Sequence, residues 1–428
     1  MPPSDYTAMW AGLRLDLAAH DQLLKVLGQA YTDIYLSQAN RPQAMTYLDF
    51  VLSEIHGLRI QELLAAKQAG RKVIGTFCTY VPEEIILAAD AVCVGLCAGG
   101  DVGIEQAEQY LPRNTCALIK SFVGFKLAGV CPYVEACDFV IGETTCDGKK
   151  KAYEIFGGFK DMFVLETPQM KTAADRTLWR TEIGRLTGKV EAATGRKITY
   201  EKLLAATQVV NAKRQALHRL NGLRRAEPAP ISGRDALLIN QVQFFDDPIR
   251  LTAKINALCD ELETRIARRA GIAPVGTPRV LVSGCPMAAP NWKLPYLVEK
   301  NGAVIVGEES CIGERGTRNL VNERATTRDE LLDRIAERYL KIDCACFTPN
   351  DERLDHIVQM ARDYRADGVI DYALQFCTPY TMESFRVKQR LQREGIPLLK
   401  IETDYSMQDA PQLETRIQAF LELLQARG

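Results

Sequence analysis

The sequence lacks the long apolar stretch that a membrane-spanning helix requires. No apolar run reaches the roughly 18 positions needed to cross a bilayer. The first residues, MPPSDYTAMWAGLRLDL, are interrupted by charge, so we expect no signal peptide. The sequence also lacks an excess of charge, because 53 Lys and Arg balance 54 Asp and Glu. We therefore expect a soluble cytoplasmic protein that binds neither nucleic acid nor a membrane.

Nucleotide-binding motifs are missing as well. No G-x-G-x-x-G follows a predicted strand. The segment from Gly142 to Lys150 resembles a phosphate loop only loosely, because five residues instead of four separate its glycines and no Ser or Thr follows the lysine. We therefore expect no nucleotide site in this chain.

The signs of a zinc site are also scarce. The sequence has no C-x₂-C pair, which structural zinc sites usually use. It has four histidines, all in helical or charged stretches away from the cysteines, where exposed or capping roles are expected: His20, His56, His218 and His356.

Cysteine, by contrast, is abundant. The chain has thirteen, an odd number that cannot pair completely, and its 428 residues can bury a large core without disulfides. In a reducing compartment, clustered cysteines indicate metal binding or catalysis. We therefore predict a metal or cluster site ahead of inert buried thiols and ahead of disulfides.

The apolar pattern predicts an α/β fold with two doubly wound, flavodoxin- or Rossmann-like parallel sheets. We expect an N-terminal helical arm at 1–68, a first α/β cluster-binding domain at 69–171, a helical insert at 172–275 and a second α/β cluster-binding domain at 276–428. The predicted strands are 71–78, 91–97, 138–142, 161–165, 279–285, 303–307, 342–347, 368–376 and 397–402.

Several cysteines follow the predicted strands. Cys146, Cys311 and Cys377 each come after a strand, at the edge where an open α/β sheet binds its ligands. A helix N-terminus at that edge also favours the thiolate form. Thiolates suit zinc or iron–sulfur, and single cysteines dispersed over strand ends favour a cluster held between the domains.

The remaining cysteines and their polar neighbours are less decisive. We expect Cys93 and Cys259 to be buried apolar residues. Cys344 and Cys346 share one face of a predicted strand, so one could ligate while the other packs. Glu143 could donate a proton, with helix capping or solvation as the alternative. Lys149, Lys150 and Lys151 are expected to form a solvated helix face, or to offset the charge of a cluster.

Several segments carry a resemblance to a known family. They are GTFCTYVPEEIILAADAVCVGLCAGG (75–100), VIGETTCDGKKKAYE (140–154) and GVIDYALQFCTPYTMES (368–384), with shorter matches at 110–133, 307–315, 346–350 and 396–406. The chain resembles the 2-hydroxyacyl-CoA dehydratase and benzoyl-CoA reductase superfamily, and most closely its double-cubane cluster protein branch. GETTCDGKKK is the match most specific to that branch.

The resemblance implies a set of cluster ligands. In the superfamily three cysteines hold a 4Fe–4S cubane, and here these would be Cys116, Cys146 and Cys377. The double-cubane branch carries an 8Fe–9S unit and needs about three more thiolates, for which we predict Cys131, Cys311 and Cys346. Cys97 and Cys344 are the reserves, and Glu143 is the candidate catalytic residue.

The resemblance also implies partners and an activity. It implies a homodimer, and a separate ATP-hydrolysing 4Fe–4S activator that supplies electrons for the reduction of small unsaturated molecules. Three alternatives stay open: a dehydratase or benzoyl-CoA reductase-type subunit with a single 4Fe–4S cluster, a non-catalytic electron-transfer or cluster-carrying protein, and a zinc-stabilised scaffold.

Overall fold

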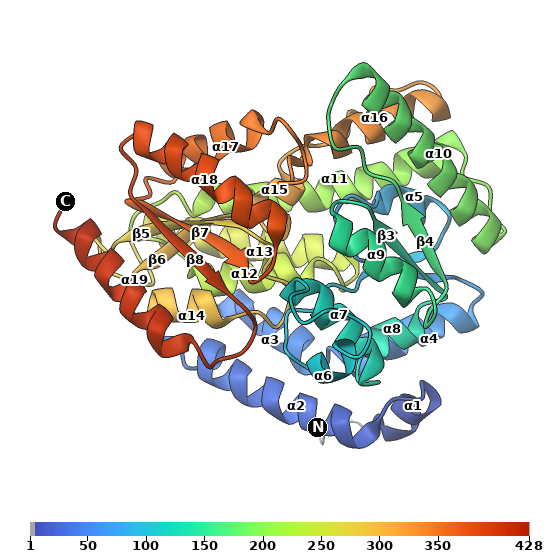
Figure 1. The fold of residues 1–428 in the computed structure, drawn as a ribbon, viewed down its shortest axis with the longest axis horizontal. Helices are drawn as coiled ribbons and strands as arrows, with labels where there is room; N and C mark the ends of the chain where they lie inside the picture. Colours follow the sequence, from blue (N-terminus) through green and yellow to red (C-terminus); the bar gives the residue numbers. More distant parts are fainter. Residues whose placement is uncertain (1–4, 428) are drawn as a thin grey trace.

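Two four-stranded parallel sheets form the frame of the protein in a computed structural model that describes residues 5–427. The first sheet has the order β2-β1-β3-β4 and the second the order β6-β5-β7-β8, so the two share one topology (Figure 1). The strands are β1 (Val73–Thr76), β2 (Val92–Gly95), β3 (Phe139–Glu143), β4 (Met162–Leu165), β5 (Arg279–Gly284), β6 (Val304–Glu309), β7 (Gly368–Leu374) and β8 (Leu398–Thr403).

The burial of the strands explains why the sequence forms them. Every residue of β1, β3, β5 and β7 is buried, whereas the edge strands β4 and β8 are partly exposed. Central parallel strands are covered on both faces, so they read as continuous apolar runs. The predicted α/β class with two doubly wound sheets is confirmed.

Helices alternate with the strands of each sheet. Those of the first sheet are α5 (Glu83–Ala88), α6 (Ile104–Ala107), α7 (Ala117–Leu127), α8 (Pro132–Ala136) and α9 (Asp147–Phe156). Those of the second are α14 (Lys293–Lys300), α15 (Glu314–Thr317), α16 (Arg328–Tyr339), α17 (Asp351–Asp363), α18 (Thr378–Arg393) and α19 (Ala410–Gln425).

The arm and the insert are both helical, as predicted. The arm, drawn in blue in Figure 1, contains α1 (Thr7–Gly12), α2 (Leu17–Tyr31), the π-helix η1 (Thr32–Leu36), the 3-10 turn η2 (Gln43–Met45), α3 (Thr46–Ser53) and α4 (Leu58–Gln68). The insert contains α10 (Ala173–Thr194), α11 (Tyr200–Leu223), α12 (Gly233–Val242) and α13 (Pro248–Ala267). The domain boundaries themselves stay predictions.

One predicted strand is wrong. The segment 342–347 is not extended, because a 3-10 turn η3 (Leu340–Ile342) is followed by Asp343 in the left-handed region, at φ 53°. The buried Asp343 carboxylate pairs with Lys171 and Arg318, and these ion pairs stabilise the turn. Cys344 and Cys346 therefore lie in a loop.

No helix between residues 5 and 427 is both long enough and apolar enough to cross a membrane.

Candidate functional site

The strand order places cysteines where each sheet has its ligand crevice. In an order of the type 2-1-3-4, the crevice opens at the carboxyl ends of the two central strands. Cys78 follows β1 and Cys146 follows β3, whereas Cys285 follows β5 and Cys377 follows β7. Both halves of the protein therefore bring sulfur to their switch points.

Four of the cysteines lie at helix N-termini. Cys116, Cys131, Cys146 and Cys377 are the N-cap residues of α7, α8, α9 and α18. Cys146 Sγ accepts a hydrogen bond of 3.5 Å from the amide of Lys149. Burial raises the pKa of the Cys146 thiol, and this amide opposes the rise. The predicted placement of Cys146 and Cys377 before helices is confirmed, and such termini favour a bound thiolate.

A first group of cysteines joins the two halves and consists of Cys116, Cys146 and Cys377. The adjacent Cys377 thiol, followed by burial, raises the pKa of Cys116 well above its ordinary value. Cys116 in turn raises the pKa of Cys146. Cys285 extends this group, because it raises the pKa of Cys377. Its Sγ also accepts a hydrogen bond of 3.3 Å from the amide of Leu374. Three predicted ligands thus lie in one region.

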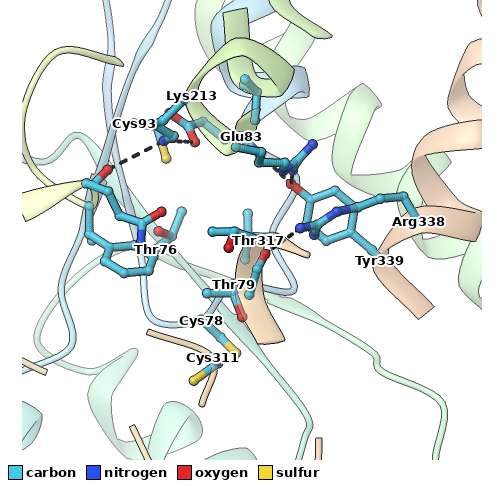
Figure 2. Close-up of a pocket in the computed structure, with 17 residues that line it drawn as sticks. Thr76, Cys78, Thr79, Glu83, Cys93, Lys213, Cys311, Thr317, Arg338 and Tyr339 are labelled. Atoms are coloured by element: carbon cyan, nitrogen blue, oxygen red, sulfur yellow. Dashed lines mark hydrogen bonds and ion pairs between the residues drawn. The ribbon is translucent and has the colours of Figure 1, made fainter. Parts of the chain in front are cut away.

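A second group consists of Cys78, Cys311, Cys344 and Cys346. Cys311 raises the pKa of Cys78, Cys344 raises that of Cys311, and Cys78 raises that of Cys346. Cys78 and Cys311 also line one small cavity of about 60 Å³, and Figure 2 shows their sulfur atoms near one another. The sequence-based prediction did not select Cys78, although its place just after β1 was a usable signal.

Buried cations surround the second group. A hydrogen bond with Cys346 and the guanidinium of Arg315 hold the pKa of Cys344 below its ordinary value, against the effect of burial. Arg315 lies over the ring of Tyr380, with 5.3 Å from its Cζ to the centroid, and the Tyr380 hydroxyl is 3.6 Å from Cys344 Sγ. This region can therefore hold anionic sulfur.

Glu143 and Lys149 form a buried ion pair beside the cysteines. The Lys149 ammonium donates to Glu143 Oε1 at 2.5 Å, and the same carboxylate accepts from Thr145 at 2.8 Å and from Tyr153 at 3.2 Å. The expected solvated role is therefore wrong for Lys149, because this side of α9 faces the core. Glu143 is likewise neither a cap nor solvated, since its carboxylate is fully enclosed.

Lys150 and Lys151 of the same helix are exposed, as predicted. They pair with Asp147 and Glu154 on the surface of α9.

Two further predicted ligands have other surroundings. The Cys97 thiol donates to the carbonyl oxygen of Phe77 at 2.6 Å, and burial raises its pKa to about 12. Burial raises the pKa of Cys131 to about 11, and the charged side chains that act on it are Glu135 and Lys126, from α8 and α7. Cys311 and Lys149 also act on the pKa of Cys97, which places Cys97 beside the second group, whereas the charged groups that act on Cys131 belong to α7 and α8.

Two other expectations have clear outcomes. Cys259 is fully buried in the core, as predicted. The exposed or capping role expected for the histidines is wrong for His20 and His56, which are buried and share a hydrogen bond of 2.9 Å between Nε2 and Nδ1. The arm and the turn before α4 cover both rings.

The donor chemistry fits an iron–sulfur group. All thirteen cysteines are free thiols. Among residues 5–427, no three histidine, cysteine or acidic side chains converge on a single point as the ligands of one ion do. A cluster of several irons takes each thiolate on a different iron, so its ligands stand further apart. Soft thiolates at helix N-termini with buried cations nearby suit such a group.

A large chamber adjoins the second group. Its volume is about 540 Å³, and Cys78, Cys97, Cys311 and Lys149 form part of its wall. The arm contributes much of the remaining wall, with residues of α1, α2 and the turn after α3. A molecule inside the chamber is therefore adjacent to the cysteines.

Several known proteins are similar to this chain over most of its length. The family described as 2-hydroxyglutaryl-CoA dehydratase, D-component, matches residues 78–424. The Escherichia coli (strain K12) protein YjiM, whose name describes a dehydratase subunit, is 40% identical over 84% of this chain and 93% of its own length. The (R)-phenyllactyl-CoA dehydratase beta subunit of Clostridium sporogenes is 27% identical over the same shares.

A more distant relative has a reductase name. A benzoyl-CoA reductase subunit of Thauera aromatica is 24% identical over 77% of this chain and 84% of its own length. The chain thus belongs to the 2-hydroxyglutaryl-CoA dehydratase, D-component family, whose relatives include subunits of dehydratases and reductases.

Proposed function

We propose that this protein is the cluster-bearing component of an oxidoreductase that reduces small unsaturated molecules. The observation that carries the proposal is the pair of cysteine groups, each of which contains thiols from both halves of the protein. A single 4Fe–4S cubane needs only one such group. Two adjacent groups therefore favour an 8Fe–9S double cubane.

The surroundings of the thiols suggest the six ligands. Cys116, Cys146 and Cys377 hold the first cubane. Cys78, Cys311 and Cys346 hold the second, with Cys344 as its reserve. Cys78 takes the place that the resemblance gave to Cys131, because Cys78 interacts with Cys311 and Cys346. Cys97, whose pKa Cys311 also raises, stays a second reserve.

The chain's own residues prepare the site in three ways. When bound, an iron–sulfur group supplies electrons of a potential set by charge, hydrogen bonds and burial. Arg315 and Lys149 place positive charge beside the thiolates of the second group. The chamber surrounds the same region with a largely apolar wall. Glu143 fixes the Lys149 ammonium at the chamber wall and is the candidate catalytic acid or base.

The proposal includes partners and a location. The electrons come from a separate ATP-hydrolysing 4Fe–4S activator, which fits a chain whose sequence carries no nucleotide motif. The protein works as a homodimer in the cytoplasm. Several relatives are named as beta subunits, which supports work in an assembly.

A second candidate function is an acyl-CoA dehydratase or reductase subunit with a single 4Fe–4S cluster on Cys116, Cys146 and Cys377. The names of the relatives at 27% and 24% identity favour it. On this alternative the second cysteine group holds no iron.

Anaerobic iron and sulfide analysis together with an EPR spectrum separates the two candidates. The double cubane predicts about eight irons per chain, and the alternative predicts about four. Acetylene reduction that requires activator, ATP and a strong reductant would support the reductase. An iron content of about four, with spectral change on adding an acyl-CoA, would overturn it.

A further inference from the structure

The large chamber next to Cys78 and Cys311 has a largely apolar wall. Aromatic side chains reach it from separate parts of the chain: Trp10 and Tyr31 from the arm, Phe244 from the insert, and Trp292 from the loop before α14. Ligand sites of roughly 300–1,000 Å³ with mostly apolar walls are the usual binding sites for small molecules. At about 540 Å³ the chamber falls in this range.

The wall of the chamber offers an incoming anion no free cation. Among the described lining residues, the carboxylate and ammonium groups belong to Glu54 and Lys149. Glu54 accepts hydrogen bonds from the Tyr6 hydroxyl at 2.6 Å and from the amide of Leu58 at 3.3 Å. Lys149 is bound to Glu143. A carboxylate or phosphate entering the chamber would lose its hydration without gaining a free cation, which is unfavourable.

We propose, on the basis of the function proposed above, that the chamber binds an uncharged apolar molecule of ring size, an arene or alkene without a carboxylate or a thioester-linked CoA. The volume leaves ample room for a ring, because an apolar cavity of about 150 Å³ already takes up benzene. Cys78 and Cys311 in its wall bring the unsaturated bond next to the proposed second cubane.

The reaction on such a molecule is balanced. One carbon–carbon π bond is broken and two C–H bonds form. The two electrons come from the reduced ATP-dependent donor named in the proposed function, and the two protons come from water. Nothing leaves the substrate, so the chamber has to release only a molecule of nearly the same size and polarity.

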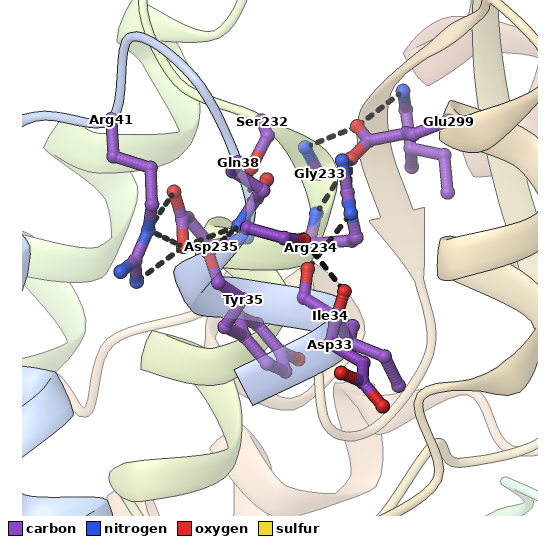
Figure 3. Close-up of polar contacts among 12 residues, drawn as sticks. Asp33, Ile34, Tyr35, Gln38, Arg41, Ser232, Gly233, Arg234, Asp235 and Glu299 are labelled. Carbon is purple, nitrogen blue, oxygen red and sulfur yellow. Dashed lines mark hydrogen bonds and ion pairs between the residues drawn. The ribbon is translucent and has the colours of Figure 1, made fainter. Parts of the chain in front are cut away.

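The arm supplies one side of this wall. Its lining residues, among them Trp10, Leu27 and Tyr31, lie outside residues 78–424, which the family model matches. The arm is also firmly held. Figure 3 shows Arg41 against the buried Asp235 of α12, and Arg234 next to the carbonyl of Ile34 in η1.

A binding experiment on the anaerobic holoprotein tests the proposal. Toluene is the probe, and benzoate is its charged analogue with the same ring. Two of the three tryptophans, Trp10 and Trp292, line the chamber, so fluorescence and calorimetry can both follow binding. We expect saturable binding of toluene and none of benzoate or benzoyl-CoA. Equal binding of benzoate or benzoyl-CoA, or no binding of toluene, would overturn the proposal.

A matched pair of variants locates the bound molecule. Leu27→Trp fills the chamber from α2 and should weaken toluene binding by about tenfold or more. Val26→Trp, on the neighbouring exposed position, should bind toluene like the unmodified protein. Unchanged binding by Leu27→Trp would place toluene elsewhere and contradict the proposal. If Leu27→Trp does not fold, the comparison of toluene with benzoate on the unmodified protein still decides.

A failure of the chamber proposal can be told apart from a failure of the proposed function. Iron content near eight without toluene binding would remove only the chamber proposal. Toluene binding with about four irons would remove only the double cubane.

Discussion

The backbone amide of Ala117 donates a hydrogen bond of 3.2 Å to the carbonyl oxygen of Gln375. This bond joins the first turn of α7, in the first half of the protein, to the loop between β7 and α18, in the second half. Cys116 precedes Ala117, and Cys377 lies shortly after Gln375. The bond therefore sets the position at which the two thiols meet.

Replacing Ala117 with proline should loosen this junction without breaking α7. Ala117 is the first residue of the helix, a position that tolerates proline, and the extended backbone of Cys116 suits a residue before proline. The loss of one hydrogen bond should cost about 1 kcal/mol. We expect faster loss of iron to a chelator. Ala117→Gly keeps the amide and is the control, and equal release rates would contradict this role.

Iron analysis of single cysteine variants tests the proposed ligands. Cys78→Ala should lose about half of the iron, because it removes a ligand of the second cubane. Cys131→Ala should keep its iron, since its thiol interacts with α7 and α8. Cys259→Ala, a fully buried core position, controls for packing effects. Full iron in Cys78→Ala together with a loss in Cys131→Ala would restore the set that the resemblance implied.

The pair of Lys149 and Glu143 should tune the reduction potential in opposite directions. Lys149→Gln leaves a buried carboxylate near the cysteines and should lower the potential. Glu143→Gln leaves an ammonium and should raise it. Each single change should also destabilise the protein by about 3–5 kcal/mol, because a buried charge loses its partner.

An EPR-monitored redox titration of the holoprotein measures these shifts. The double variant Lys149→Gln/Glu143→Gln should return the potential toward that of the unmodified protein. Shifts of the same sign in both single variants would indicate a purely structural effect.

Two buried histidines should make stability depend on pH. Burial lowers the pKa of His56 from 6.5 to about 3 and lowers that of His20 as well. The unfolded chain then binds more protons than the folded one below about pH 6.5, so the free energy of unfolding falls as the pH drops. His56 alone contributes about 1.4 kcal/mol per pH unit in this range.

Thermal midpoints between about pH 7 and pH 5.5 measure this dependence. The double variant His20→Phe/His56→Phe removes both partners of one hydrogen bond and should flatten the curve. His218 and His356, whose pKa values burial also lowers, remain in the variant and leave part of the slope. An unchanged slope would contradict the assignment.

The sequence predicted the fold well because buried parallel strands leave a continuous apolar signal. It also placed Cys146, Cys311 and Cys377 at strand ends. The failure at 342–347 has a local cause, because a short apolar run does not reveal that Asp343 adopts a left-handed conformation to reach Lys171 and Arg318.

The rest of the site depends on contacts that only the tertiary structure provides. Lys149 looks like its two exposed neighbours in sequence, yet its side of α9 faces a buried carboxylate. The residues next to Cys78 and Cys131 in the sequence do not show which of the two is a ligand. Only the packing of the two sheets brings Cys78 to Cys311. His20 and His56 lie 36 residues apart and meet because α2 packs against the turn before α4 within the arm.

Helix α11 has a mechanical consequence. Its 24 residues make a rod about 36 Å long. Lys213 and Arg214 attach it to Glu83 and Glu84 of α5, and Asn211 donates to the carbonyl of Val321 beyond α15. All three attachments lie within one turn of the rod, so this turn ties α5 of the first half to the segment after α15 of the second. The two halves cannot separate here without breaking buried ion pairs or a buried hydrogen bond.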